Sequence, residues 1–155
     1  MSQPDIFRNY GYILELQGER AGYFTSIRSQ GLKVSCIEYR EGGTPNAVRK
    51  LPGQTSVVPI VCEWGVTNTR SMWDWLMSAV NGVVERREIS VIILGTDGVT
   101  EKVRWNYSNV WPSEWHGAEL VASGNDIAIE SMVLQAESVE RAPDVQGATG
   151  DAVEA

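Results

Sequence analysis

Hydrophobic and polar residues alternate along much of this chain, which is the pattern of short β-strands. In the first such run, Tyr12, Leu14 and Leu16 share one face, as expected of a strand with one buried side. Further predicted strands lie at residues 23–27, 32–37, 99–107 and 126–140, and two apolar runs at residues 56–64 and 90–94 also indicate strands. Tight turns are expected at residues 17–20 and 96–98, because both segments are rich in turn-forming residues. The pattern predicts a mainly β protein.

Two of the predicted strands carry an irregularity. Pro59 interrupts an apolar run and, because proline cannot donate a hydrogen bond to a neighbouring strand, it indicates an edge strand or a bulge. In the last run, the apolar residues change phase between Ile129 and Met132. A shift of one residue moves every side chain to the opposite face. We therefore expect a bulge or break near Glu130 and Ser131.

One segment, at about residues 69–82, has the period of an amphipathic helix. Its polar residues recur every three or four positions and leave a broad apolar face. That face consists of Met72, Trp73, Trp75, Leu76, Met77, Ala79, Val80 and Val83. Asn68 or Thr69 is suited to cap the start of the helix, and Gly82 is suited to end it. The sequence predicts a helix that covers one end of a sheet or barrel.

Length and composition bound the class of protein. The chain has 155 residues, of which 43% are hydrophobic and 21% charged, which suffices for one globular domain with its own core. A net charge of −7 disfavours binding to nucleic acid or to an anionic membrane. We see neither a membrane span nor a secretory signal. The expected domain is residues 1–141, followed by a flexible acidic tail at residues 142–155.

The chemically reactive residues match no catalytic or metal-binding motif. His116 is the one histidine of the chain, which excludes the two-histidine metal motifs. Cys36 and Cys62 lack zinc spacing, and we expect both to be buried. Ser113, Glu114 and His116 are neighbours in sequence, but catalytic triad partners must converge in space, so His116 is expected in a surface loop. The six tryptophans are expected in the core or an interface, with an exposed carbohydrate platform as the alternative. The sequence predicts no enzymatic activity, no cofactor and no metal.

A long segment from Ile37 to Gly53 connects two strand patterns. Long connections in compact domains are usually functional or disordered. This one combines apolar residues with charges of both signs, as expected of a surface that contacts another copy of the chain. The candidate interface residues are Glu38, Tyr39, Arg40, Glu41, Gly42, Gly43, Val48, Arg49, Lys50, Leu51 and Pro52. Among them, Tyr39, Val48 and Leu51 are spaced like apolar anchors. A hairpin tip without a partner is the alternative interpretation.

The same segment resembles a known protein family. Residues 37–43 and 48–53 are similar to stretches of the tail tube proteins of contractile-tailed phages and contractile injection systems. Further short matches follow in the same order at residues 64–67, 73–75, 82–87, 103–106, 110–115, 124–130 and 137–141. Each match is weak alone, but the series is collinear and extends from about Phe7 to Arg141.

This resemblance implies a small β-barrel or sandwich with one helix, like the type VI secretion tube proteins. It also implies hexameric rings whose inner sheets join around a lumen and which stack into a hollow tube inside a contractile sheath. The long segment is expected to reach the adjacent ring, with salt links from Arg40, Glu41, Arg49 and Lys50. The implied partners are other copies of the chain, the sheath protein, baseplate and tube-initiator proteins, and lumen cargo.

The implied function is that of an inner-tube subunit, made in the bacterial cytoplasm and assembled in a phage tail or injection particle. Such a tube is driven into the target when the sheath contracts. The alternative within the same family is a baseplate-proximal tube initiator or a tube-end adaptor ring. The resemblance implies neither a membrane anchor nor sequence-specific binding of nucleic acid.

Overall fold

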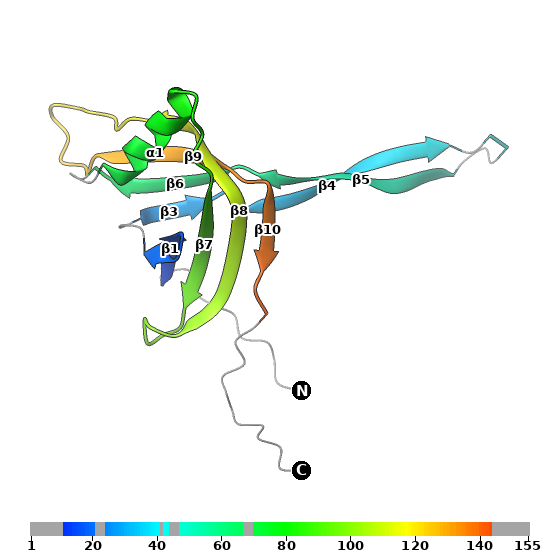
Figure 1. The fold of residues 1–155 in the computed structure, drawn as a ribbon, viewed down its shortest axis with the longest axis horizontal. Coiled ribbons are helices and arrows are strands. Elements are labelled where there is room, and N and C mark those ends of the chain that lie inside the picture. The colour runs from blue at the N-terminus through cyan, green and yellow to red at the C-terminus, as the bar shows by residue number, and fades with distance from the viewer. Residues whose placement is uncertain (1–10, 21–23, 41, 44–46, 67–69, 144–155) are drawn as a thin grey trace, which may run out of the picture.

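The computed structural model describes residues 11–20, 24–40, 42–43, 47–66 and 70–143 (Figure 1). The strands are β1 (Tyr12–Leu16), β2 (Glu19–Arg20), β3 (Phe24–Arg28), β4 (Gly31–Arg40), β5 (Val48–Val58), β6 (Ile60–Gly65), β7 (Arg87–Leu94), β8 (Glu101–His116), β9 (Ile129–Gln135) and β10 (Ser138–Arg141). The helix is α1 (Ser71–Val80). The prediction of a mainly β protein with one helix is confirmed. The expected tail at residues 142–155 falls almost entirely outside the described residues.

An eight-stranded antiparallel sheet makes the body of the molecule. Its order is β2-β1-β7-β8-β9-β6-β3, and β10 also pairs with β8. Strand β8 belongs to both halves, because its first part pairs with β7 and β10 and its last part, from Trp111, pairs with β9. The two halves run crosswise to each other (Figure 1). The Tyr12 hydroxyl donates a hydrogen bond of 2.9 Å to the carbonyl of Phe24 and so links β1 to β3.

The hydrophobic core lies between the two halves of the sheet and under the helix. Its buried residues are Leu14, Ile60, Cys62, Met72, Trp75, Leu76, Ile89, Val91, Tyr107, Val110, Met132 and Leu134. Trp75 is fully buried, and its Nε1 donates to the carbonyl of Glu85 at 2.7 Å. Trp73, in the first turn of α1, packs edge to face against Trp115 of β8, with 5.1 Å between the ring centroids. The helix therefore covers one end of the sheet, as predicted.

The helix ends where the sequence indicates. The N–H of Gly82 donates to the carbonyl of Ala79, and the N–H of Val83 donates to that of Ser78, which is the Schellman arrangement. The caps proposed for the start, Asn68 and Thr69, lie outside the described residues. Both predicted turns are also present, at residues 17–18 between β1 and β2 and at residues 95–100 between β7 and β8.

The second turn is stabilised by a carboxylate. The side chain of Asp97 accepts hydrogen bonds from the backbone N–H groups of Val99 and Thr100 and from the Thr100 hydroxyl. These bonds favour the charged form of the acid and lower the pKa of Asp97 to about 2. Asp97 therefore fixes the connection into the long strand β8.

The expected bulge near Glu130 and Ser131 is wrong. Strand β9 pairs with β6 without interruption from Ile129 to Leu134, and the irregularity lies on β8 between Pro112 and Glu114. The change of phase has another cause. Ile127 and Ile129 are 79% and 43% exposed, so these apolar residues face solvent while Met132 faces the core. Pro59 lies between β5 and β6, so it marks a break between two strands and not the expected edge position or bulge.

Candidate assembly interface

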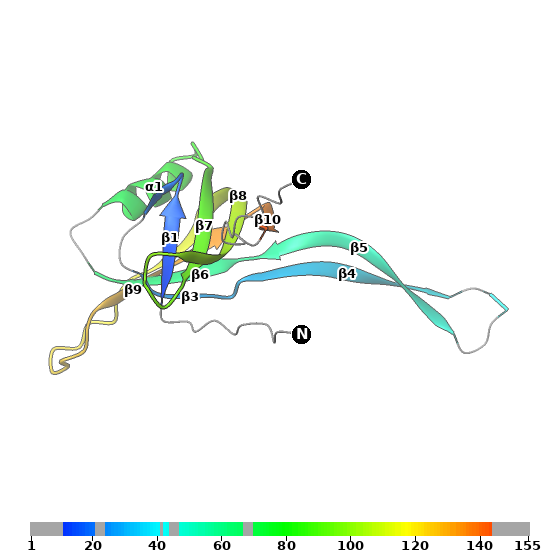
Figure 2. The same cartoon turned by 90° about the horizontal axis from the view of Figure 1, so that it is seen from below.

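Strands β4 and β5 form a separate two-stranded sheet that extends away from the body (Figure 2). They pair from Gly31 and Val58 at the root to Arg40 and Val48 near the tip. The segment from Ile37 to Gly53, expected as a long connection, is thus mostly a paired hairpin. Neither face of β4 is buried, since every residue after Gly31 is exposed. Period-2 alternation needs one buried face, which explains why the sequence pattern did not reveal the full strands.

The root of the hairpin is tied to the core. The hydroxyl of the buried Tyr107 donates a hydrogen bond of 2.8 Å to Oε1 of Gln30, the residue that precedes β4. Burial raises the pKa of Tyr107 to about 12. A hollow of about 380 Å³ beside this bond is lined by Gly31, Leu32, Trp105, Val139 and neighbouring residues. The hairpin therefore leaves the body from a defined anchor.

A β-bulge divides the hairpin into a root half and a distal half. Val34 pairs with Thr55, but Cys36 pairs with Pro52, so β5 contains one extra residue. A Cβ atom at Gly53 would overlap the Oγ of Ser35 and lie 3.1 Å from its carbonyl oxygen. A side chain at this position would have to displace Ser35, which glycine avoids. Bulges increase the local twist, and the two strands cross over beyond this point (Figure 2).

The distal half has two different faces. Residues directly opposite each other in a strand pair share a face. Ile37 pairs with Leu51 and Tyr39 with Arg49, which makes one face largely apolar. The exposed fractions of Ile37, Tyr39 and Leu51 are 53%, 50% and 46%.

The other face holds most of the charge. Its opposed pairs are Cys36 with Pro52, Glu38 with Lys50 and Arg40 with Val48. Val48 therefore lies on the opposite side of the hairpin from Tyr39, away from the other two expected anchors. Cys36 is exposed, which corrects the expectation that both cysteines are buried, whereas Cys62 lies in the core.

The structure brings the predicted interface residues together on this distal half. Gly42 and Gly43 form an exposed turn at the tip, and Glu41 lies outside the described residues. Residues 31–58 carry four basic and two acidic side chains, a net charge of +2, so the remainder of the −7 chain carries −9. The hairpin is a basic arm on an acidic body. Its role as an interface stays a prediction.

Sequence reasoning missed a second exposed apolar segment, the connection between β8 and β9 at residues 117–128. The exposed fractions of Leu120, Val121 and Ile127 are 83%, 57% and 79%. A hollow of about 310 Å³ is lined by Glu119, Val121, Gly124, Asp126, Ile127 and Ile129. The sequence did contain one indication of this segment. The apolar pattern shifts by one residue after Ile129, because Ile127 and Ile129 face solvent.

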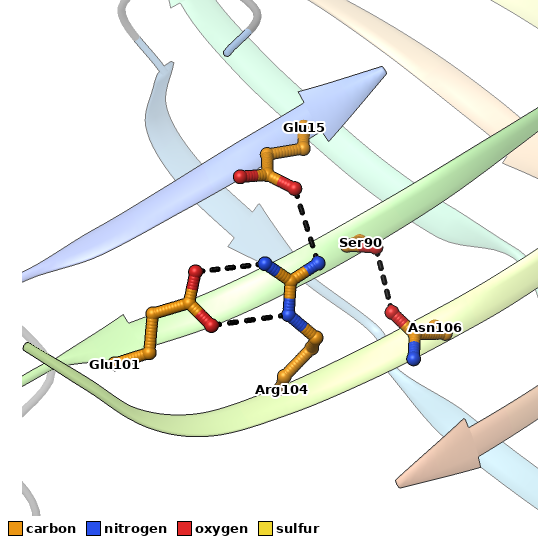
Figure 3. A network of polar contacts seen from close by, with 5 residues as sticks. All are labelled: Glu15, Ser90, Glu101, Arg104 and Asn106. Carbon is orange, nitrogen blue, oxygen red and sulfur yellow. Dashed lines mark hydrogen bonds and ion pairs between the residues drawn. The ribbon is translucent and has the colours of Figure 1, made fainter. Parts of the chain in front are cut away.

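A network of polar side chains lies on the outer face of β1, β7 and β8 (Figure 3), and the buried Ile92 shares that face. Arg104 donates to Glu15 at 3.0 Å and to both carboxylate oxygens of Glu101 at 2.7 and 3.2 Å. The hydrogen bonds from Arg104 lower the pKa of Glu101. Beside this network the Ser90 hydroxyl donates to Oδ1 of Asn106 at 2.7 Å. The charges of this network partly neutralise one another at the surface, where the side chains of Arg104 and Glu15 are 28% and 14% exposed.

The residues considered for catalysis do not form a reactive group. Ser113 donates to the carbonyl of Val133 at 3.3 Å, while the exposed His116 lies 3.1 Å from Glu114. His116 ends strand β8 and does not lie in a loop. Among the described residues, no group of three or more histidine, cysteine or acidic side chains is placed to hold a metal. Within the same residues no helix is long and apolar enough to cross a membrane.

Comparisons with known proteins agree with this architecture. The family described as T4-like virus tail tube protein gp19 matches residues 8–140. The solved structure of the anti-feeding prophage tube-terminating cap is similar over 92% of this chain and 94% of its own, with 26% identity and a TM-score of 0.80. No curated protein sequence matches the chain.

Two further structures extend the comparison. The extended sheath–tube complex of the extracellular contractile injection system PVC contains a chain that is 26% identical, with a TM-score of 0.77 and coverage of 88% of this chain and 91% of its own. A type six secretion system protein shares the fold at 12% identity, with a TM-score of 0.59 and coverage of 84% and 81%. The predicted resemblance and the tube-like fold are thereby confirmed.

Proposed function

The chain belongs to the T4-like virus tail tube protein gp19 family, and we propose that it is a ring-forming subunit of the tube. Tail tube proteins are structural components, so the chain is a component of a phage tail or contractile injection particle and not an enzyme. In the proposed assembly, copies of the chain form hexameric rings that stack around a lumen. The sheath is the proposed outer partner, because a similar chain occurs in a sheath–tube complex.

The exposed hairpin is the observation that carries this proposal. An isolated two-stranded hairpin is marginally stable in water, yet β4 and β5 have 10 and 11 residues and extend beyond the body. Exposed apolar patches of this kind mark contact surfaces. A second copy that covers Ile37, Tyr39 and Leu51 would stabilise the hairpin and bury its apolar face.

The sheet supports ring closure. Strands β2 and β3 lie at the two ends of the strand order, and β10 pairs with β8 alone among the described strands. Free edges are prone to uncontrolled pairing, and pairing between neighbours in a closed ring removes them. The outer face of β1, β7 and β8, which carries the polar network around Arg104 (Figure 3), is our proposed wall of the lumen.

The proposal has two forms, a ring within the tube trunk and a ring at a tube end. The comparison with the tube-terminating cap, at a TM-score of 0.80, supports the end ring. The comparison with the sheath–tube complex, at 0.77, supports the trunk. Since the first value is the larger, the end ring is the better supported form. The two forms differ in the product expected from purified protein, which is discrete rings for an end ring and tubes of indefinite length for a trunk subunit.

The test is to shorten the hairpin. Residues 35–54 are replaced by Asn-Gly, a dipeptide that closes a two-residue hairpin turn, so that the Val34–Thr55 pair is kept. We expect intact rings by light scattering and negative-stain electron microscopy, with no contacts between rings. Circular dichroism and thermal unfolding establish that the body remains folded. At a concentration at which rings of the unmodified chain stack, equal stacking of the shortened chain would show that the hairpin is not the assembly contact.

A further inference from the structure

The hairpin and the β8–β9 connection lie at opposite ends of the molecule, as both ribbon views show (Figures 1 and 2). We propose that the connection at residues 117–128 is the receptor for the hairpin tip of a second copy in the adjacent ring. This inference rests on the proposed function, because it names the partner surface of the same hairpin. It assigns both halves of one contact to a single chain.

The apolar surfaces of the two segments complement each other. The hairpin presents Ile37, Tyr39 and Leu51 on one face. The connection presents Leu120 and Ile127, 83% and 79% exposed, beside the 310 Å³ hollow. Aromatic side chains that enter small pockets are typical anchors of protein interfaces. Tyr39 is the side chain of the hairpin that fits this role.

The charges of the two segments are opposite. Arg40 and Lys50 lie on the distal hairpin, whereas Glu119 and Asp126 line the hollow. Residues 117–130 contain three acidic residues and no basic one. Within the part of the chain that the structure describes, none of the side chains of Arg40, Lys50, Glu119 and Asp126 forms an ion pair. Opposite charges across an interface set its register and speed association.

The placement of the two segments also fits an open stack. A contact between different surfaces of identical subunits is head to tail, and it continues indefinitely where rotation does not close it. Each copy would fill one receptor and offer another, so rings add at either end. An end ring leaves one of the two surfaces unfilled, which gives a terminating partner a surface to cover.

Charge reversal tests the pairing in the full-length protein. The hairpin variant carries Arg40→Glu and Lys50→Glu, the receptor variant carries Glu119→Lys and Asp126→Lys, and a third protein carries all four substitutions. Glu85→Lys with Glu88→Lys is the matched control, because both residues are exposed acids beside the start of β7, outside the hairpin, the receptor and the edge strands. Sedimentation velocity at several salt concentrations measures association between rings.

We expect each reversed pair to weaken ring association at least about tenfold, and the four-fold variant to recover most of it. The control should behave like the unmodified protein. A receptor variant that associates as well as the control, while the hairpin variant does not associate, overturns the receptor assignment and leaves the proposed function standing. Unmodified protein that forms discrete rings without contacts between them overturns the receptor assignment alone, and unmodified protein that forms no rings at any concentration overturns both.

Chemical cross-linking gives an independent reading of the same contact. The chain has three lysines, Lys33, Lys50 and Lys102, so zero-length carbodiimide products are few. Rings mixed from ¹⁴N- and ¹⁵N-labelled chains separate links between copies from links within one copy. Mixed-isotope peptides that join Lys50 to Glu119 or Asp126 support the receptor. Mixed-isotope links from Lys50 only to acids outside residues 117–130 contradict it.

Discussion

The apolar face of the hairpin allows a sharp test of how rings are held together. Ile37 and Leu51 lie opposite each other in the distal half, and 53% and 46% of their surfaces are exposed. We consider the double variant Ile37→Ala with Leu51→Ala. Full burial of such a side chain contributes about 1.5–3 kcal/mol. Covering the exposed half of each therefore contributes about 1 kcal/mol, or about 2 kcal/mol for each hairpin.

This magnitude predicts a large effect on assembly and a small one on the subunit. A loss of about 2 kcal/mol weakens each contact about thirtyfold, and the loss is repeated for every subunit of a ring. Within the subunit the two residues form only a cross-strand pair, which is worth about 0.2–1 kcal/mol. The subunit should therefore unfold at nearly the same denaturant concentration as the unmodified chain.

The assay compares the critical concentration for ring stacking, measured by sedimentation, with the free energy of unfolding in urea. Val99→Ala with Val83→Ala is the matched control, because these residues are 73% and 75% exposed but lie outside the hairpin. An unchanged critical concentration for the hairpin variant, or an equal rise for the control, would refute the reasoning. A fall in unfolding free energy of several kcal/mol would show that the face stabilises the subunit instead.

Three further predictions concern the body and its cysteines. Leu134→Ala, at a fully buried site of β9, should lower the free energy of unfolding in urea by about 2–5 kcal/mol, and a change under about 1 kcal/mol would contradict the assigned core. A thiol reagent should label Cys36 quickly but Cys62 only on unfolding, because burial raises the pKa of Cys62 to about 12; two equally fast thiols would be inconsistent with this. Asp97→Asn should reduce the dependence of the unfolding free energy on pH in acid. The reason is that a carboxyl with its pKa lowered to about 2 stabilises the fold at any pH above its ordinary pKa of about 4. That contribution disappears as the pH falls through about 2, so equal slopes in urea titrations of both proteins over this range would oppose the assignment.

The sequence predicted the strands of the eight-stranded sheet better than it predicted the β4–β5 hairpin. Strands with one buried face, such as the run that contains Val103 and Tyr107, alternate because the core selects apolar residues on one side. The turn at Asp97 and the helix end at Gly82 follow from local hydrogen bonding, which sequence reports directly. The hairpin has no buried face, so the sequence pattern showed only the run at residues 32–37 and not the full length of β4 and β5.

At the candidate interface, too, the sequence indicated some residues and missed others. Residues 38–52 were predicted as an interface because they combine apolar and charged residues in a pattern that is not typical of a buried strand. The receptor segment went unnoticed because the exposure of Ile127 and Ile129 was interpreted as a bulge. Ile129 is out of phase although the pairing of β9 with β6 is regular, because it faces solvent and not the core.

The distribution of charge gives the assembly a testable dependence on salt. A basic hairpin of net charge +2 extends from a remainder of net charge −9, so copies repel each other in most orientations and attract when a hairpin meets an acidic end. Such steering weakens as salt shortens the range of electrostatic forces to about 8 Å at physiological ionic strength. Burial of apolar surface does not weaken in this way. Added salt should therefore slow ring association while it leaves the dissociation rate nearly unchanged, and stopped-flow light scattering after mixing and after dilution would measure the two rates. A dissociation rate that rises with salt as steeply as the association rate falls would mean that the charges hold the rings together instead of guiding them, and that Tyr39 and its apolar neighbours contribute little.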